Sequence, residues 1–133
     1  MTDETGREAL DRVLLSLYPT AEIDGVTATA RFEPQPEHRG NPGWLQGGLA
    51  AAVLDHVCAR AAAAALDARV VTATLDLRYR RPVAIADGPY TVRAEAAANR
   101  PRSRMVRVVG AILGPDTGHL VEAKALFVVR PGG

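Results

Sequence analysis

The segment GGLAAAVLDHVCARAAAAAL, which runs from Gly47 to Leu66, decides the fold of this chain. It is rich in alanine, the best helix former, and therefore predicts one long helix. Ordinary core residues recur along it: Leu49, Val53, Leu54 and Val57. Small residues lie three, four or seven positions from Asp55 and form a small-residue face: Gly48, Ala51, Ala52, Ala59 and Ala62. We expect a sheet to curl tightly around this face, with one carboxylate in its middle.

The sequence on both sides of this segment has the two-residue period of β-strands. Upstream, alternating apolar residues predict one strand from Glu22 to Phe32, and the prolines and glycines between Pro34 and Gly48 predict an irregular loop. Downstream, four more strands are predicted: Val70–Tyr79, Pro89–Asn99, Ser103–Leu113 and His119–Arg130. In the first of these four, the alternation places Thr72 on the polar side.

The connections between the downstream strands are short, which favours antiparallel neighbours. One long helix must then cover one face of the sheet. The sequence therefore predicts an α+β fold, with a five-stranded antiparallel sheet around one long central helix, in a single domain spanning residues 1–133. Apolar spacing between Glu4 and Leu17 adds an N-terminal helix.

Composition narrows the function classes. The net charge of +1 and the aromatic content of 5% give no drive toward nucleic acid. Cys58 is the only cysteine, which rules out an internal disulfide and fits a cytoplasmic location. The stretch from Met1 to Leu17 lacks the pattern of a signal peptide, and Gly47–Ala59 is too short to span a bilayer, so we expect no membrane. No His, Asp or Cys set has the spacing of a metal site.

Two segments carry a resemblance to a known family. The loop GNPGWLQGG, Gly40 to Gly48, is followed seven residues later by Asp55, and VTATLDLRYRRP spans Val71 to Pro82. Together they resemble the hotdog-fold thioesterases of the PaaI-like branch, and most nearly the THEM-like acyl-CoA thioesterases. In that family a His-Gly-Gly loop opens the central helix and an acid follows at this spacing. The resemblance covers about residues 32–129.

The resemblance implies a hotdog fold and hydrolysis of an acyl-CoA or a related acyl thioester, without a cofactor. It implies that the Gly47 amide is the oxyanion donor and Asp55 the general base or nucleophile. Thr72 is then a helper contributed by the partner subunit. It also implies a homodimer, with dimers often pairing into tetramers.

The physical chemistry of these residues agrees with such roles. A helix that begins at Gly47 and Gly48 presents unpaired N–H groups and the positive end of its dipole. The glycines leave room for a substrate carbonyl to approach the backbone. A good oxyanion donor is worth roughly 3 kcal/mol in the transition state. Asp55 could activate water or attack the carbonyl directly, with Thr72 holding the water.

Further residues are candidates for positioning the substrate. Gln46 stands where the family usually has His; its amide can donate a hydrogen bond but cannot titrate near neutrality. Gly40 replaces the loop Asn of some relatives, and Asn41 lies one position away. Trp44 is expected to pack in the core of the loop, although it could also wall the acyl channel. Arginines could bind the phosphates of CoA, with two of the set expected to do so: Arg80, Arg81, Arg100, Arg102 and Arg104. The histidines are expected to be structural or surface groups: His38, His56 and His119.

Two other functions compete with hydrolysis. Gln46 supports a catalytically silent hotdog protein that binds acyl thioesters or serves in assembly. A hydratase or dehydratase would need a His poised beside an acid, and the helix-start loop offers none, so it ranks last. Asp55 could also be a structural acid, and Thr72 an ordinary strand residue. The sequence leaves open the acyl group and the choice between CoA and carrier-protein thioesters.

Overall fold

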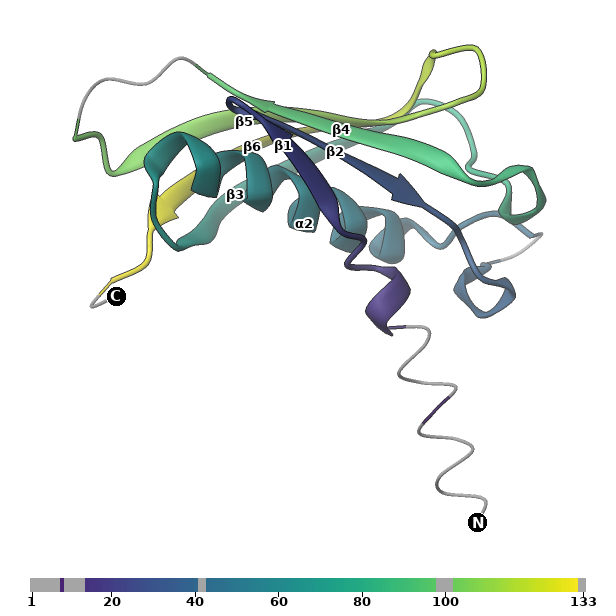
Figure 1. Cartoon of the computed structure of the whole chain (residues 1–133). Helices are drawn as coiled ribbons and strands as arrows, with labels where there is room; N and C mark the ends of the chain where they lie inside the picture. The colour runs from purple at the N-terminus through teal and green to yellow at the C-terminus, as the bar shows by residue number, and fades with distance from the viewer. Residues whose placement is uncertain (1–7, 9–13, 41–42, 98–101, 132–133) are drawn as a thin grey trace.

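The protein folds as one antiparallel sheet laid across one long helix. The computed structural model describes residues 8, 14–40, 43–97 and 102–131. Its strands and helices follow in chain order: β1 Ala21–Asp24, β2 Thr27–Phe32, a short 3-10 helix Pro36–His38, α2 Gly47–Leu66, β3 Val70–Tyr79, a second 3-10 helix Ile85–Asp87, β4 Tyr90–Ala96, β5 Met105–Leu113 and β6 His119–Val129. The sheet has the strand order β1-β2-β4-β5-β6-β3, and α2 runs across one of its faces (Figure 1).

This arrangement confirms the predicted α+β hotdog architecture, with a difference in strand count. The sheet has six strands, because the single strand predicted for Glu22–Phe32 is a hairpin. Gly25 adopts a left-handed φ of 61°, which glycine tolerates without strain, and turns the chain between Asp24 and Thr27. The predicted N-terminal helix lies largely outside the described residues, although Leu14–Ser16 is helical.

The helix α2 has the predicted bounds and ends where Asp67 turns left-handed at φ 48°. Its length and composition alone would allow it to cross a membrane. In this fold it is the core helix, and one side is buried against the strands: Ala50, Val53, Leu54, Val57, Cys58, Ala61 and Ala62. The sheet therefore packs on the larger side chains, which bury more apolar surface.

The small-residue face was expected to meet the sheet, and that expectation is wrong except at Ala62. Gly48 is exposed, and Ala51, Ala52 and Ala59 are only half-buried. Asp55 lies among them, also half-buried. One side of a very apolar helix is thus left incompletely covered within a single chain.

A β-bulge in β3 changes which side chains face the helix. The pairing of β3 with β6 shifts between Thr72 and Thr74, so Ala73 is an extra residue. A bulge reverses the alternation of a strand on one side of it. Thr72 therefore points to the helix side together with Leu75 and Leu77, and its predicted place on the polar side with Asp76 and Arg78 is wrong.

Gly110 of β5 packs directly against Cys58 of α2. A Cβ at this position would stand 2.7 Å from the sulfur of Cys58, which is fully buried. Real Cβ atoms do not approach other atoms so closely, and a packed core accommodates extra atoms poorly. Glycine is thus required at position 110 by the side chain of Cys58.

We therefore expect Gly110→Ala to destabilise the protein by about 1–3 kcal/mol, the usual cost of overpacking a core. Replacing the sulfur with a hydrogen in Cys58→Ala makes room for the new methyl group. The double variant should be more stable than Gly110→Ala alone in urea unfolding, which is a direct test of coupling. Additive effects of the two changes would show that the contact does not limit position 110.

Candidate active site

The start of α2 presents backbone N–H groups toward solvent. The carbonyl of Gln46 accepts hydrogen bonds from the N–H groups of Leu49 and Ala50, and Gln46 itself is extended at φ −62° and ψ 138°. Gly47 and Gly48 are exposed, and within the described part of the chain their N–H groups have no hydrogen-bond partner. A Cβ on Gly48 would meet nothing within 4 Å. The helix start is open to an incoming carbonyl oxygen.

The loop before the helix is held by backbone hydrogen bonds on both sides. The N–H of Gln46 donates to the carbonyl of His38 at 3.0 Å, and the N–H of Leu45 donates to that of Val83 at 2.7 Å. The N–H of Gly40 donates to the carbonyl of Trp44, also at 2.7 Å. These bonds fix the position of the free N–H groups.

A cavity of about 340 Å³ lies beside the helix start. Its walls include four residues predicted for the site: Trp44, Gly47, Arg80 and Arg81. Tyr79, at the end of β3, also lines the cavity, and its hydroxyl donates a 2.6 Å hydrogen bond to the carbonyl of Gly47. That carbonyl and the N–H of Gly48 belong to one planar amide. The tyrosine therefore fixes the direction in which the Gly48 N–H points.

Asp55 and Thr72 form a second part of the site. The Thr72 hydroxyl donates a 2.7 Å hydrogen bond to Oδ1 of Asp55, across from β3 to α2. The expectation that Thr72 comes from the partner subunit is therefore wrong: the bulge in β3 brings it to the aspartate of its own chain. This bond occupies one carboxylate oxygen and orients the other.

The two parts are too far apart within one chain to act on one carbonyl group. Asp55 follows Gly47 by eight residues in a continuous helix. At a rise of 1.5 Å per residue, their backbones are about 12 Å apart along the axis. An attacking oxygen must lie about 3 Å from the carbonyl carbon, and an oxyanion donor must lie about 3 Å from the oxygen of the same carbonyl group. One chain holds both the free N–H groups and the carboxylate but does not bring them together.

The candidate phosphate-binding arginines are dispersed. Arg80 donates to Glu122 at 2.6 Å, and this bond, followed by that from His119, lowers the pKa of the Glu122 carboxyl. Arg81 lies 3.8 Å from Asp116. Arg102 and Arg104 are exposed and precede the first residue of β5. They lie at the end of the sheet where β3 begins, which is the end opposite to the start of α2. Asn41 and Arg100 lie outside the described residues.

Two other side chains of α2, those of Cys58 and His56, are not available as a nucleophile or a base. Burial and the charge of Asp55 raise the pKa of Cys58 to about 12, so its thiol stays protonated. His56 bonds the carbonyl of Pro19 at 2.9 Å. No group of three possible metal ligands occurs within the described ranges.

A Ser–His contact also exists near the helix-start loop. The buried ring of His38 lies 2.9 Å from the hydroxyl of Ser16 and accepts the N–H of Gln35 at Nδ1. A neutral imidazole that accepts at Nδ1 carries its proton at Nε2 and donates it. His38 is therefore a donor to Ser16 and cannot act as its base. The contact ties the N-terminal segment to the loop, as expected for a structural histidine.

The fold is that of a hotdog protein, and its candidate site has two parts, the start of α2 and the Asp55–Thr72 pair. The family model of the thioesterase superfamily matches residues 43–112, which include the helix start, Asp55 and Thr72. This chain belongs to the thioesterase superfamily.

Solved structures share the fold. AziG from S. sahachiroi is 20% identical, with a TM-score of 0.78 over 88% of this chain and 95% of that one. A thioesterase superfamily protein from Shewanella loihica PV-4 is 26% identical, with a TM-score of 0.70 over 85% and 91%. A phenylacetic acid degradation-related protein from Ralstonia eutropha JMP134 is 24% identical, with a TM-score of 0.75 over 89% of both chains. A comparison with curated proteins found no significant match.

Tyr79→Phe tests whether the hydroxyl positions the helix start. The change removes the bond to the Gly47 carbonyl and keeps the ring, so we expect the amide resonance of Gly48 to shift and thioester turnover to fall about 2–12-fold, the equivalent of one hydrogen bond. Tyr90→Phe is the matched control, because the Tyr90 hydroxyl donates an equal 2.6 Å bond to the carbonyl of Ala84. Equal effects of both variants on turnover would reduce Tyr79 to a general stabilising role.

Proposed function

We propose that this protein hydrolyses an acyl-CoA, or a related acyl thioester, to the free acid and the thiol. The site is formed between two subunits: Asp55 and Thr72 of one subunit, and the start of α2 of the other. The observation that carries the proposal is the hydrogen bond between Thr72 and Asp55, which holds a half-buried carboxylate ready on a helix face of small residues. The thioesterase superfamily membership supports the same reaction class.

The pairing of subunits follows from what one chain leaves uncovered. β3 is the last strand of the sheet, and its outer edge has no partner strand among the described residues. Val71 and Tyr79 on this strand are 41% and 53% exposed. Natural proteins cover or pair such edges. In a dimer whose sheets continue through β3, an antiparallel partner brings its helix start toward Asp55 and covers the small-residue face.

The reaction is divided between the two subunits. The thioester oxygen accepts the Gly47 N–H of one subunit, with the Gly48 N–H beside it, and the helix dipole favours the developing negative charge. Asp55 of the other subunit removes a proton from water, while Thr72 keeps the carboxylate oriented. The hydroxide adds to the carbonyl carbon, the C–S bond breaks, and the thiolate takes up the proton. In the variant route Asp55 itself attacks the carbonyl carbon, the C–S bond breaks and the thiolate leaves. Water then hydrolyses the acyl-aspartate anhydride to the free acid and Asp55, whose proton passes to the thiolate.

We propose separate binding regions for the acyl chain and for the CoA part of the substrate. Trp44 and Tyr79 form the apolar wall beside the helix start and are the proposed contacts of the acyl group. For the phosphates of CoA, Arg81 at the cavity and Arg102 of the partner subunit are the candidates, because Arg80 donates to Glu122 at 2.6 Å whereas Arg81 lies a longer 3.8 Å from Asp116. No cofactor is needed in this scheme, and a cytoplasmic location remains part of the proposal.

One observation favours a second candidate function. The side chain of Gln46 is exposed and makes no capping hydrogen bond to the start of α2. Among the described residues it therefore makes no contact by which it would take over the role of the family histidine. The alternative is a silent relative that binds acyl thioesters without turnover.

Asp55→Asn separates these functions. It keeps the shape of the side chain and removes the base, so kcat should fall by roughly 10²–10⁴ in a thiol-release assay with a panel of acyl-CoAs. Thr72→Val should cost less, and Thr72→Ser should retain most of the activity because the hydroxyl remains. Wild-type protein with bound acyl-CoA but no turnover would establish the silent relative. Turnover that survives Asp55→Asn would place the chemistry elsewhere.

A further inference from the structure

Arginines gather at the end of the sheet where β3 begins. They come from three adjacent chain segments: the N–H of Val129 donates to the carbonyl of Arg104, and the N–H of Arg130 donates to that of Arg69, both at 2.8 Å. We call the five arginines of these segments the arginine cluster: Arg69, Arg102, Arg104, Arg107 and Arg130. All five are exposed.

The arginine cluster concentrates one sign of charge. None of its members forms an ion pair with any residue that the structure describes. Asp67, at the end of α2, is the only acid within residues 67–71, 102–107 and 128–131. The whole chain has a net charge of only +1, so the rest of it is acidic on balance. Positive charges held close together repel one another, and an acidic partner would relieve that repulsion.

An exposed apolar row crosses the outer face of the sheet between these arginines. Met105 of β5 pairs with Val128 of β6, which pairs with Val71 of β3, and we call these three residues the apolar row. Met105 is 53% exposed and Val71 41%. Arg107 follows Met105 by two residues and Arg130 follows Val128 by two, so in antiparallel strands they lie on opposite sides of the row. Apolar residues with methionine and arginine, bounded by charge, are typical of protein–protein interfaces.

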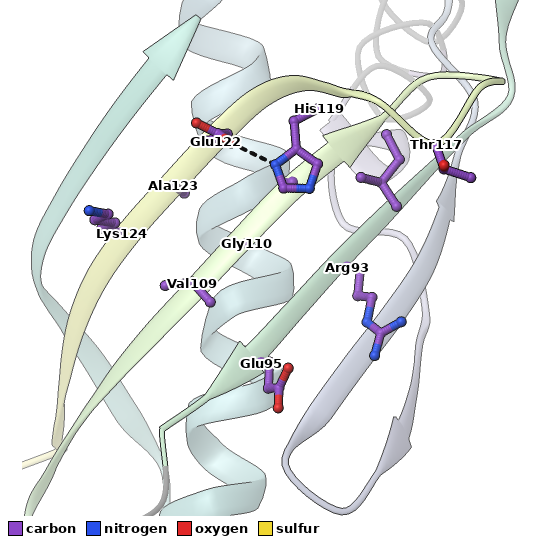
Figure 2. A pocket seen from close by; sticks show the side chains of 11 residues that line it. Arg93, Glu95, Val109, Gly110, Thr117, His119, Glu122, Ala123 and Lys124 are labelled. Atoms are coloured by element: carbon purple, nitrogen blue, oxygen red, sulfur yellow. Dashed lines mark hydrogen bonds and ion pairs between the residues drawn. The ribbon is translucent and has the colours of Figure 1, made fainter. Parts of the chain in front are cut away.

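A groove of about 480 Å³ farther along the same face has a different charge pattern (Figure 2). Its lining over β4, β5 and β6 mixes bases with acids: Arg93, Glu95, His119, Glu122 and Lys124. His119 and Glu122 contact each other at 2.6 Å, as the dashed line in Figure 2 shows. Opposite charges side by side largely cancel at a distance. An acidic partner is therefore attracted to the arginine cluster and not to the groove.

The arginine cluster lies next to the Asp55–Thr72 part of the site. Arg69 precedes Thr72 by three residues, which is about 10 Å in a strand. In the proposed dimer, antiparallel pairing through β3 brings the helix start of the partner subunit toward this same end. A protein bound at the arginine cluster can therefore deliver a thioester on a flexible arm to the shared site.

We propose that the arginine cluster and the apolar row bind an acidic carrier protein that bears the acyl group as a thioester on a pantetheine arm. The inference rests on the proposed hydrolysis, and it selects the carrier-protein thioester over the thioester of CoA. Two arginines are proposed for the phosphates of CoA, which leaves Arg69, Arg107 and Arg130 and the apolar row without a role. A broad acidic protein surface engages all of these, and long-range attraction raises the rate of encounter.

The test compares one acyl group on three carriers. The acyl group that is hydrolysed fastest as a pantetheine thioester is placed on CoA and on the acidic acyl carrier protein of a bacterial fatty-acid synthase. At low salt, kcat/KM should be about 10-fold higher for the carrier-protein thioester than for the CoA thioester. This advantage should disappear at high salt, because salt screens exposed charges.

The double variant Arg107→Glu with Arg130→Glu reverses two charges, one on each side of the apolar row. KM for the carrier-protein thioester should rise about 10-fold with little change in kcat. Turnover of the pantetheine thioester, which carries neither phosphate nor protein, should stay the same. Arg31→Glu with Arg93→Glu is the matched control: it makes the same charge change at exposed positions of β2 and β4, outside the arginine cluster, and should leave all three substrates unaffected.

A CoA thioester turned over as well as the carrier-protein thioester overturns the proposal, and so does an unchanged KM in the double variant. In sedimentation velocity, a loss of assembled mass in the double variant would make the apolar row a contact between copies of this chain and would also overturn it.

Binding of the acylated carrier protein to Asp55→Asn, followed by fluorescence anisotropy, separates docking from hydrolysis. If the wild type hydrolyses no thioester but Asp55→Asn binds the carrier protein, and the added Arg107→Glu and Arg130→Glu changes abolish that binding, the proposed hydrolysis fails and the docking stands. If pantetheine and CoA thioesters are hydrolysed but the carrier protein does not bind, the hydrolysis stands and the docking fails.

Discussion

One helix holds two groups of the candidate site at a fixed separation, and the arrangement of the site depends on it. α2 carries free N–H groups at its start and a carboxylate eight residues later, and the helix rise keeps them about 12 Å apart. No rotation of a side chain can close that distance. A thioester carbonyl that needs both groups therefore needs two helices. In the proposed mechanism, oligomerisation is therefore a requirement of the chemistry.

The side of α2 that carries Asp55 is left half-covered within one chain. The larger apolar residues of α2 face the sheet, and Gly48, Ala51, Ala52 and Ala59 face away from it. Small side chains allow a second backbone to approach closely. Asp55 lies on this face, and the bulge in β3 turns Thr72 toward it. The open strand edge, the small-residue face and the oriented carboxylate all lie on the side that a partner would occupy.

Local sequence signals predicted the long helix and β3 to the residue, because alanine content, flanking glycines and alternation act over short ranges. The hairpin at Gly25 had a usable signal, since Asp-Gly between alternating residues is typical of a tight turn. The bulge at Ala73 had none, because it arises from the register with β6. For the same reason the alternation put Thr72 on the wrong face. Tyr79 was missed as a positioning residue because its contact with Gly47 joins segments far apart in the chain.

A mixed dimer tests most directly whether two subunits share the site. Gly47→Pro removes one N–H while the helix can remain, since proline suits the first helical position and Gln46 already has the extended conformation that precedes proline. Gly47→Ala is the control that keeps the N–H, and its Cβ would meet Tyr79 at an ordinary 3.6 Å.

Asp55→Asn and Gly47→Pro homodimers should both be nearly inactive. A mixed dimer, co-expressed with two tags and purified through both, contains one intact site made of Asp55 from one chain and Gly47 from the other. If two subunits share the site, this mixed dimer regains about half of the wild-type activity per dimer. A mixed dimer as inactive as its two parents would show that the two groups are not combined across subunits, which is the opposite result.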